Sequence, residues 1–204
     1  RRRLAELAAE RNLLVLEDDP YGLVRYGGEP LPSVFELAGG EQIAYCSSFS
    51  KTVAPGVRVG WYVLPSQLAA EIEALAVSTY ISPPYLSQAT VFEFLQRESF
   101  EPNLERIRSI LGAQRDAMLS SLAAELSGRA TWSQPDGGYF VWLELGNGID
   151  ASALLGRATE AGVTFVRGTD FFADGGGVSA ARLAFSYEPP ERIAEGVRLL
   201  ASLL

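Results

Sequence analysis

Residues 13–22 read Leu-Leu-Val-Leu-Glu-Asp-Asp-Pro-Tyr-Gly, a run of four apolar residues followed directly by a polar turn. A short, continuous apolar run is typical of a strand that is buried on both faces of a parallel sheet. In open α/β sheets, ligands bind beyond the carboxyl ends of such strands. The segment therefore predicts an α/β fold with a ligand site near the turn that contains Asp18 and Tyr21.

A second apolar strand, residues 43–46, runs into the polar segment Ser47-Ser-Phe-Ser-Lys51. Side chains alternate along an extended chain, so the hydroxyls of Ser48 and Ser50 are expected to share a face. A Pro-Gly turn follows at residues 55–56 and can reverse the chain, which would bring Arg58 close to these hydroxyls. Two hydroxyls and a guanidinium suit a phosphate dianion, because arginine binds phosphate through two parallel hydrogen bonds. A polar loop with a structural arginine is the alternative interpretation.

Lys51 stands out because it is the only lysine in the sequence, whereas the other 16 of the 17 basic residues are arginine. Arginine stays protonated and cannot act as an amine nucleophile, whereas lysine can lose its proton at a suitable site. The pattern therefore makes Lys51 the candidate catalytic residue. A single lysine that survives a codon bias by chance would give the same composition.

The composition also excludes several classes of function. The chain has no histidine and one cysteine, Cys46, which argues against a zinc site or a histidine-based catalytic triad. A net charge of −8 makes a nucleic-acid partner unfavourable for this segment. No apolar run approaches the roughly 20 residues that span a bilayer. A lone cysteine is consistent with a cytoplasmic location.

Hydrophobic periodicity divides the chain into three parts, residues 1–100, 101–127 and 128–204. The first contains the strands 13–16, 43–46 and 58–64 and the helices 66–77 and 86–96, and the second is a long connecting helix, 104–126. The third is a smaller α+β unit, with strands at 139–145, 163–166 and 181–185, a helix at 151–161 and a last helix that begins at the Pro189-Pro190 pair. The chain starts within an amphipathic helix that has no preceding strand, so a piece of a longer protein is expected.

The motifs together resemble the fold-type I pyridoxal-phosphate aminotransferases, in the subgroup of 2-aminoadipate and kynurenine aminotransferases. This subgroup also includes the effector domains of MocR-type transcription regulators. In order, the motifs are Glu17-Asp-Asp-Pro-Tyr21, Ser48-Phe-Ser-Lys51, Pro55-Gly-Val-Arg-Val-Gly-Trp61, Pro135-Asp-Gly-Gly-Tyr-Phe-Val-Trp142 and Ala181-Arg-Leu-Ala-Phe-Ser186. The resemblance implies the C-terminal half of the large cofactor-binding domain (1–100), the connecting helix and a small C-terminal domain.

The resemblance implies a role for each polar residue of the first part. Lys51 would form a Schiff base with pyridoxal 5′-phosphate and later move a proton on the substrate. Asp18 would pair with the pyridinium nitrogen, with Asp19 as its rival, and Tyr21 would hydrogen-bond the phenolate oxygen of the ring. The phosphate would be bound by Ser48, Ser50 and Arg58.

In the third part, the resemblance implies that Arg182 binds the α-carboxylate of the substrate, with a structural ion pair as the alternative. Arg167 stands where the family often has proline. It is either a ligand for an acidic substrate side chain or an exposed surface residue. The family's N-terminal half, which is missing here, supplies further cofactor contacts and much of the dimer contact. This segment alone is therefore expected to hold half of a site and to be inactive.

The expected activity is transfer of an amino group from an α-amino acid (aromatic, 2-aminoadipate-like or broad) to an α-keto acid such as 2-oxoglutarate. The full-length protein is expected to be a cytoplasmic homodimer. Two alternatives are the ligand-sensing domain of a MocR-like regulator, which would keep Lys51 and the cofactor, and a non-catalytic relic of a truncated gene.

Overall fold

The computed structural model describes residues 1–40, 42–146 and 148–204. The chain forms two compact units, Arg1–Ile107 and Arg108–Leu204. The division lies within the helix α5 (Phe100–Leu126), which is continuous through it. In the described residues, no helix is both long enough and apolar enough to cross a membrane.

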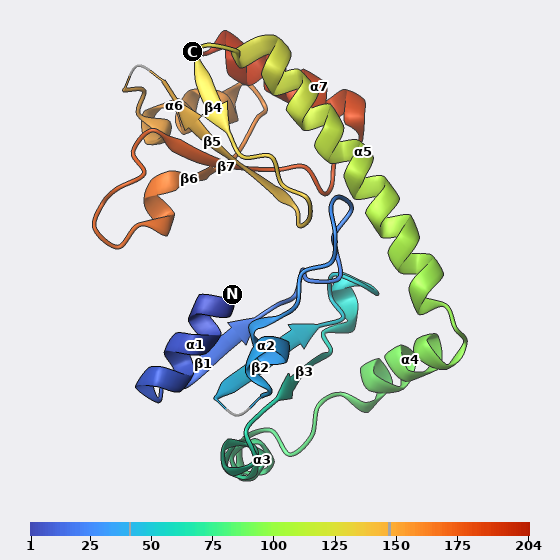
Figure 1. Cartoon of the computed structure of the whole chain (residues 1–204). Coiled ribbons are helices and arrows are strands. Elements are labelled where there is room, and N and C mark those ends of the chain that lie inside the picture. Colours follow the sequence, from blue (N-terminus) through green and yellow to red (C-terminus); the bar gives the residue numbers. More distant parts are fainter. Residues whose placement is uncertain (41, 147) are drawn as a thin grey trace. The chain divides into compact units, whose positions relative to one another are not determined.

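The first unit is built on a three-stranded sheet, drawn in blue and teal in Figure 1, with the strand order β1-β2-β3. The strands are β1 (Val15–Asp18), β2 (Ile43–Ser48) and β3 (Gly60–Val63). β1 is parallel to β2, as the apolar runs predict, and β3 is antiparallel to β2. The first strand begins two residues later than predicted because Leu13 still belongs to the preceding helix end, where its N–H bonds the carbonyl of Ala8 at 2.9 Å.

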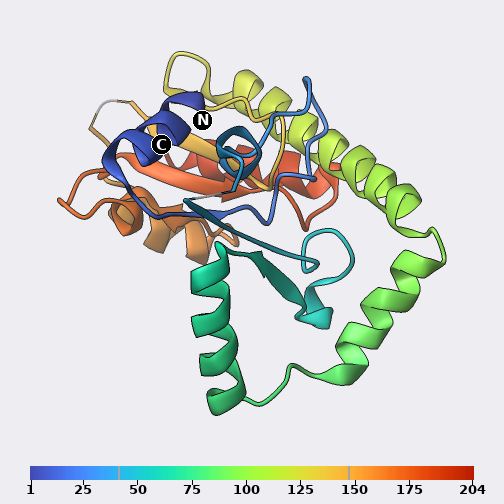
Figure 2. The same ribbon diagram turned by 60° about the horizontal axis from the view of Figure 1, so that its bottom comes forward.

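Helices accompany this sheet. They are α1 (Arg2–Arg11), α2 (Val34–Ala38), α3 (Ser66–Thr79) and α4 (Tyr85–Gln96). The core of the unit lies between α1, α2 and the sheet, and it includes Ala8, Val34 and Ile43. By contrast, α3 stands clear of the strands in Figure 2 and has no buried residue. Its apolar side chains therefore remain exposed in this chain.

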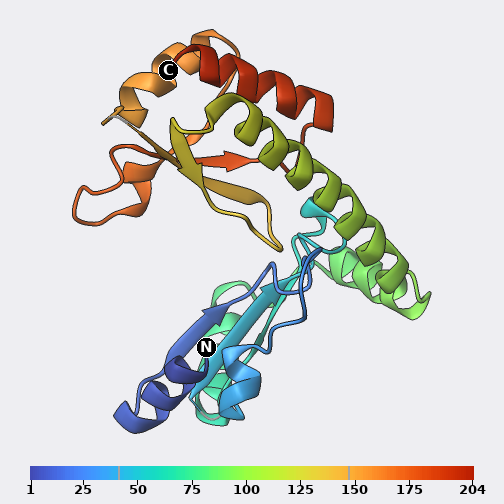
Figure 3. The ribbon, with the colours of Figure 1, turned by 45° about the horizontal axis from the view of Figure 1, so that its top comes forward.

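The second unit is a four-stranded antiparallel sheet with the order β4-β5-β7-β6. Its elements are β4 (Ala130–Trp132), β5 (Phe140–Leu145), α6 (Ala151–Glu160), β6 (Val166–Arg167), β7 (Ala180–Ala184) and α7 (Pro190–Ser202). Alternate side chains of β5 and β7, such as Leu143 and Leu183, are buried. In Figure 3, α7 runs beside the last turns of α5 on one side of this sheet.

The structure differs from the sequence prediction at two strands of the second unit. The three-residue strand β4 is not predicted, because a strand this short leaves no periodicity in the sequence. β6 is shorter than the predicted 163–166 and lies later, because the N–H of Val163 still bonds the carbonyl of Ala158 at the end of α6.

Candidate active site

The polar turn after β1 separates the two rival carboxylates. Asp18 is paired in register with Cys46 of β2, and its Oδ1 lies 3.5 Å from the Cys46 Sγ. Paired residues and residues two apart along a strand share a face, so Asp18, Cys46 and Ser48 lie on one face of the sheet. Asp19 instead accepts a hydrogen bond of 3.2 Å from the hydroxyl of Tyr45. The exposed carboxylate on the Ser48 side is therefore that of Asp18.

Both hydrogen-bond donors to these carboxylates are held in their protonated form. Burial raises the pKa of the Cys46 thiol, and the hydrogen bond and charge of Asp18 add to the effect. Burial also raises the pKa of Tyr45, followed by the negative charge of Asp19. A protonated thiol and a protonated phenol can donate, so each carboxylate keeps its own donor at neutral pH.

Ser48, Ser50 and Arg58 form one hydrogen-bonded cluster. Arg58 Nη1 donates to Ser50 Oγ at 3.0 Å, and the hydroxyls of Ser48 and Ser50 lie 2.9 Å apart. The N–H of Ser50 also donates to Ser48 Oγ at 3.0 Å. Ser50 is buried, at 6% exposure. The predicted convergence of two hydroxyls and a guanidinium is therefore present in the structure.

Arg58 does not begin a strand, in contrast to the prediction. The one-turn 3-10 helix η1 (Pro55–Val57) ends at Arg58, whose φ of 50° is left-handed, and β3 starts only at Gly60. The left-handed region is uncommon for a residue other than glycine. The rigid Pro55 at the start of η1 sets up this turn, and the turn places the guanidinium against Ser50.

Lys51 lies in the turn that follows β2, close to Tyr21. Its Nζ is 5.6 Å from the centroid of the Tyr21 ring. The turn is fixed by hydrogen bonds from the N–H groups of Thr52 and Val53 to the carbonyl of Phe49. In addition, Asn103 Nδ2 donates to the Thr52 carbonyl at 2.7 Å. The fold thus brings Lys51 and Tyr21, which are distant in sequence, to one place.

In the second unit, Arg182 projects from the sheet face opposite the core. It pairs in register with Trp142, whereas its neighbours Ala181 and Leu183 are buried. Its Nε is buried and has no hydrogen-bond partner. Arg182 forms no ion pair within the described residues, so the alternative of a structural ion pair finds no support there.

Two aromatic rings that were given no role in the sequence analysis contact Arg182. Its Cζ lies 4.0 Å from the ring centroid of Phe140 and 4.8 Å from that of Phe171. Phe140 belongs to the motif at residues 135–142, and its place two residues from Trp142 on β5 puts both on the Arg182 face. Phe171 lies on the 3-10 turn η2 (Gly168–Phe171), and no sequence signal connects it with Arg182.

Arg167 is partly exposed and paired. Its Nη2 lies 2.7 Å from Asp170 Oδ1, and its Nε lies 3.3 Å from the other oxygen of the same carboxylate. Both side chains of the pair keep about two-fifths of their surface exposed, at 43% and 42%. The positive charge of Arg167 is thus compensated locally, which disfavours it as a ligand for an acidic substrate.

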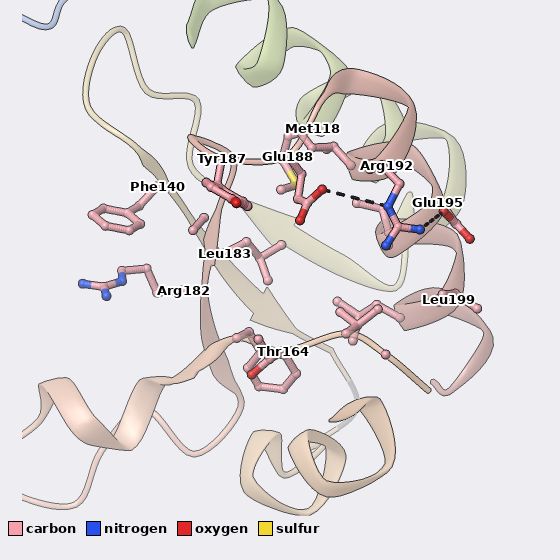
Figure 4. Close-up of a pocket in the computed structure, with 18 of the residues that line it drawn as sticks. Met118, Phe140, Thr164, Arg182, Leu183, Tyr187, Glu188, Arg192, Glu195 and Leu199 are labelled. Carbon is pink, nitrogen blue, oxygen red and sulfur yellow. Dashed lines mark hydrogen bonds and ion pairs between the residues drawn. The ribbon is translucent and has the colours of Figure 1, made fainter. Parts of the chain in front are cut away.

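A pocket of about 420 Å³ opens between α7 and the core side of β7 (Figure 4). Its lining is mostly apolar and includes Met118, Leu183 and Leu199. At one end, Arg192 is bound by Glu188 and Glu195, at 3.9 and 2.5 Å. Figure 4 shows Arg182 and Phe140 side by side at the end away from Arg192. Two carboxylates face one guanidinium there, so the Arg192 end of the pocket carries no free positive charge.

The sequence pattern of the family described as aminotransferase class I and II matches residues 2–198. The chain belongs to this family. It is 40% identical over its whole length to the 2-aminoadipate transaminase of Thermus thermophilus, and 33% identical to the aromatic-amino-acid aminotransferase 1 of Thermococcus litoralis. More distant relatives include the HTH-type transcriptional regulator NorG of Staphylococcus aureus, at 28% identity over 95% of this chain.

Solved structures of the family share the fold. The crystal structure of the α-aminoadipate aminotransferase of Thermus thermophilus, in complex with N-(5′-phosphopyridoxyl)-L-leucine, superposes with a TM-score of 0.92 at 39% identity. The match covers 100% of this chain and 53% of that one. The chain likewise covers 52% and 49% of the two transaminases named above. The predicted fold-type I α/β architecture is confirmed, and the chain spans about half the length of these relatives.

Proposed function

We propose that the full-length protein to which this chain belongs is an aminotransferase that uses pyridoxal 5′-phosphate to move an amino group from an α-amino acid to an α-keto acid. The observation that carries the proposal is the position of Lys51, whose Nζ lies 5.6 Å from the Tyr21 ring centroid. An amine beside a phenol, next to a cluster of phosphate donors, suits an aldehyde cofactor that carries a phosphate. Membership in the family supports the same conclusion.

The donor set of the first unit fits the phosphate of such a cofactor. The Ser48 hydroxyl and the Arg58 guanidinium lie 2.9 and 3.0 Å, respectively, from Ser50 Oγ. These groups donate hydrogen bonds to one another, and a phosphate oxygen can accept the same hydrogens. The guanidinium adds a charge-assisted bond, which is roughly twice as strong as a neutral one. These three side chains would hold the phosphate.

The remaining residues would hold the ring and move protons. When bound, pyridoxal phosphate supplies an aldehyde that takes up the amino group and a ring that takes up electrons. The Asp18 carboxylate would keep a proton on the ring nitrogen, and the Tyr21 hydroxyl would donate to the ring oxygen. The Lys51 amine would bind the aldehyde carbon, and once released from it would remove the proton from the α-carbon of the substrate.

Arg182 would bind the α-carboxylate of the amino acid. A bidentate arginine–carboxylate pair fixes the orientation of the substrate as well as its affinity. The names of the two transaminase relatives favour 2-aminoadipate-like or aromatic amino acids as donors. An α-keto acid such as 2-oxoglutarate would be the acceptor. We further propose that the full-length protein is a homodimer of the cytoplasm with a biosynthetic role.

A second candidate, the effector domain of a MocR-type regulator, is favoured by the regulators among the distant relatives. Such a protein would keep Lys51 and the cofactor and use them in signalling. The sequence encoded upstream of residue 1 would distinguish the two candidates. A DNA-binding winged helix there would favour the regulator. The higher identity to transaminases, 40% against 28%, favours the enzyme.

The decisive experiment is borohydride reduction of the full-length protein loaded with pyridoxal phosphate, because reduction makes the bond between amine and aldehyde permanent. We expect a stable phosphopyridoxyl group on the peptide that contains Lys51, detected by mass spectrometry. The variant Lys51→Arg keeps the charge but has no amine nucleophile, so it should show neither the label nor transamination. Labelling at another lysine, or transamination by Lys51→Arg, would refute the proposal.

A further inference from the structure

We propose that the rings of Phe140 and Phe171 hold the Arg182 guanidinium in place, so that its two terminal nitrogens form a preformed, end-on site for a carboxylate. Phe171 is then a positioning residue that acts through Arg182. This inference rests on the proposed function, since it assigns the carboxylate to the substrate. It goes further by naming the contacts that set the affinity for that group.

The rings fix the arginine without neutralising it. The guanidinium carbon is 4.0 Å from the Phe140 centroid and 4.8 Å from the Phe171 centroid, within the range of a cation–π contact. A carboxylate partner would use up the N–H groups, as Asp170 does for Arg167 in the same unit. Arg182 has no such partner within the described residues. Its full charge therefore remains for an external anion.

The buried Nε determines which edge of the guanidinium is presented. Nε is shielded from solvent and has no acceptor, although Arg182 as a whole is only half-buried. The edge that contains Nε is therefore closed to a carboxylate that comes from solvent. The edge formed by Nη1 and Nη2 is the one that can donate two parallel hydrogen bonds to a carboxylate. The anion is thus expected to approach along the axis of the side chain.

The turn that carries Phe171 is itself rigid. Gly168 packs so closely that a Cβ there would lie 2.4 Å from the Gly177 carbonyl oxygen. The ion pair of Arg167 with Asp170 spans the same turn. Trp142 meets the Phe171 ring edge-on, with centroids 5.4 Å apart at an angle of 81°. Phe171 is thereby held against Arg182 although its own side chain is 46% exposed.

The test measures carboxylate binding to the full-length, cofactor-loaded protein by titration calorimetry. The probes are hexanoate and its neutral analogue hexanamide. We expect Phe171→Leu to weaken hexanoate binding roughly tenfold, because loss of the cation–π contact frees the guanidinium. Hexanamide binding should not change, and Phe171→Tyr, which restores an aromatic face, should restore hexanoate affinity. The KM for the amino acid should rise more than kcat falls.

Phe172→Leu is the matched control, because Phe172 lies beside Trp142 at 6.3 Å in the same loop. Equal weakening by Phe171→Leu and Phe172→Leu, or unchanged hexanoate binding in Phe171→Leu, overturns the inference. If the melting temperature shows that Phe171→Leu unfolds, Phe171→Met, which also lacks an aromatic face, takes its place in the same comparison with Phe172→Met. Borohydride labelling of Lys51 is independent of these outcomes, so failure of the proposed function is distinguished from failure of this inference.

Discussion

Ser50 is the residue at which the expected phosphate donors meet, so it offers the sharpest single-residue test of that site. Replacing it by alanine removes the hydroxyl that Arg58 and Ser48 share. A hydrogen bond to a charged group contributes about 1.5–3 kcal/mol. We therefore predict that Ser50→Ala weakens pyridoxal phosphate binding to the full-length protein by about tenfold or more, as measured by absorbance titration.

The neighbouring Ser47 provides the control for this prediction. Its hydroxyl donates to the Asp19 carbonyl at 2.8 Å, and as the residue before Ser48 on β2 it faces the other side of the sheet. Ser47→Ala should leave cofactor affinity within about twofold, because its hydroxyl takes no part in the Ser48, Ser50 and Arg58 cluster. A similar loss in both variants would show that the strand rather than the hydroxyl cluster matters.

Cys46 reports on the state of Asp18. Burial and then the hydrogen bond and charge of Asp18 raise its pKa, and only the thiolate reacts with iodoacetamide. The raised pKa means that alkylation remains slow as the pH rises through the range in which a free thiol ionises. We predict that Asp18→Asn lowers this pKa and speeds alkylation of Cys46 near pH 8.5.

The alkylation rate is measured on the peptide that contains Cys46, by mass spectrometry across pH. The raised pKa of Cys46 also makes the stability of the folded protein depend on pH. Because the folded pKa is raised, its stabilisation is present below the unfolded pKa of the thiol and is lost as pH rises through the folded pKa. Asp19→Asn is the comparison variant, since Asp19 contacts Tyr45 instead. An equal effect of both variants would contradict the assignment of Asp18 to Cys46.

At the scale of elements, Glu17 connects β1 to the start of α2. Its two carboxylate oxygens accept the N–H groups of Val34 and Phe35, each at 2.9 Å. A carboxylate at a helix N-terminus also interacts favourably with the helix dipole. We predict that Glu17→Ala lowers the free energy of unfolding by about 1–3 kcal/mol in urea denaturation, because both donors lose a charged acceptor.

The exposed loop residue Glu29 supplies the matched comparison, as the same charge is removed at the surface. Glu29→Ala should change the free energy of unfolding by no more than about 0.5 kcal/mol. If Glu17→Ala is equally mild, α2 is held by its own capping box of Ser33 and Glu36 rather than by β1.

At the scale of the whole molecule, α3 and α4 leave many apolar side chains uncovered. Leu75, Ile81, Tyr85 and Leu86 are between 57% and 84% exposed. Large apolar side chains exposed in such number are typical of an interface or lead to aggregation. We predict that residues 1–204 expressed alone bind a hydrophobic dye and self-associate with rising concentration, as seen by light scattering.

Replacing Ile81, Tyr85 and Leu86 together by serine should reduce both the dye fluorescence and the association. The relatives are about twice as long as this chain. A full-length protein of that length should bind little dye, because the additional segment would cover these side chains. A monomeric, dye-free chain of residues 1–204 would show that these helices need no covering segment.

The residues proposed for the candidate site could be picked out from the order of the amino acids alone. The lone Lys51, the spacing of Ser48 and Ser50, and the apolar runs before them are local features, and local features are encoded in residue order. The apolar runs also predicted the parallel pairing of β1 with β2. The expected burial of β1 on both faces is wrong for this chain, where Leu16 is 63% exposed. Boundaries such as the start of β1 were predicted less accurately, since helix ends and strand starts compete for the same residues.

Which side chains meet became clear from the folded chain alone. It distinguished Asp18 from Asp19 by the face of the sheet each occupies, and it placed Arg58 in a left-handed turn against Ser50. It also brought Phe171 to Arg182, a contact between a loop and a strand that has no periodicity in the sequence. The physical reason is that such contacts depend on the packing of distant segments, which the order of residues specifies only through the completed fold.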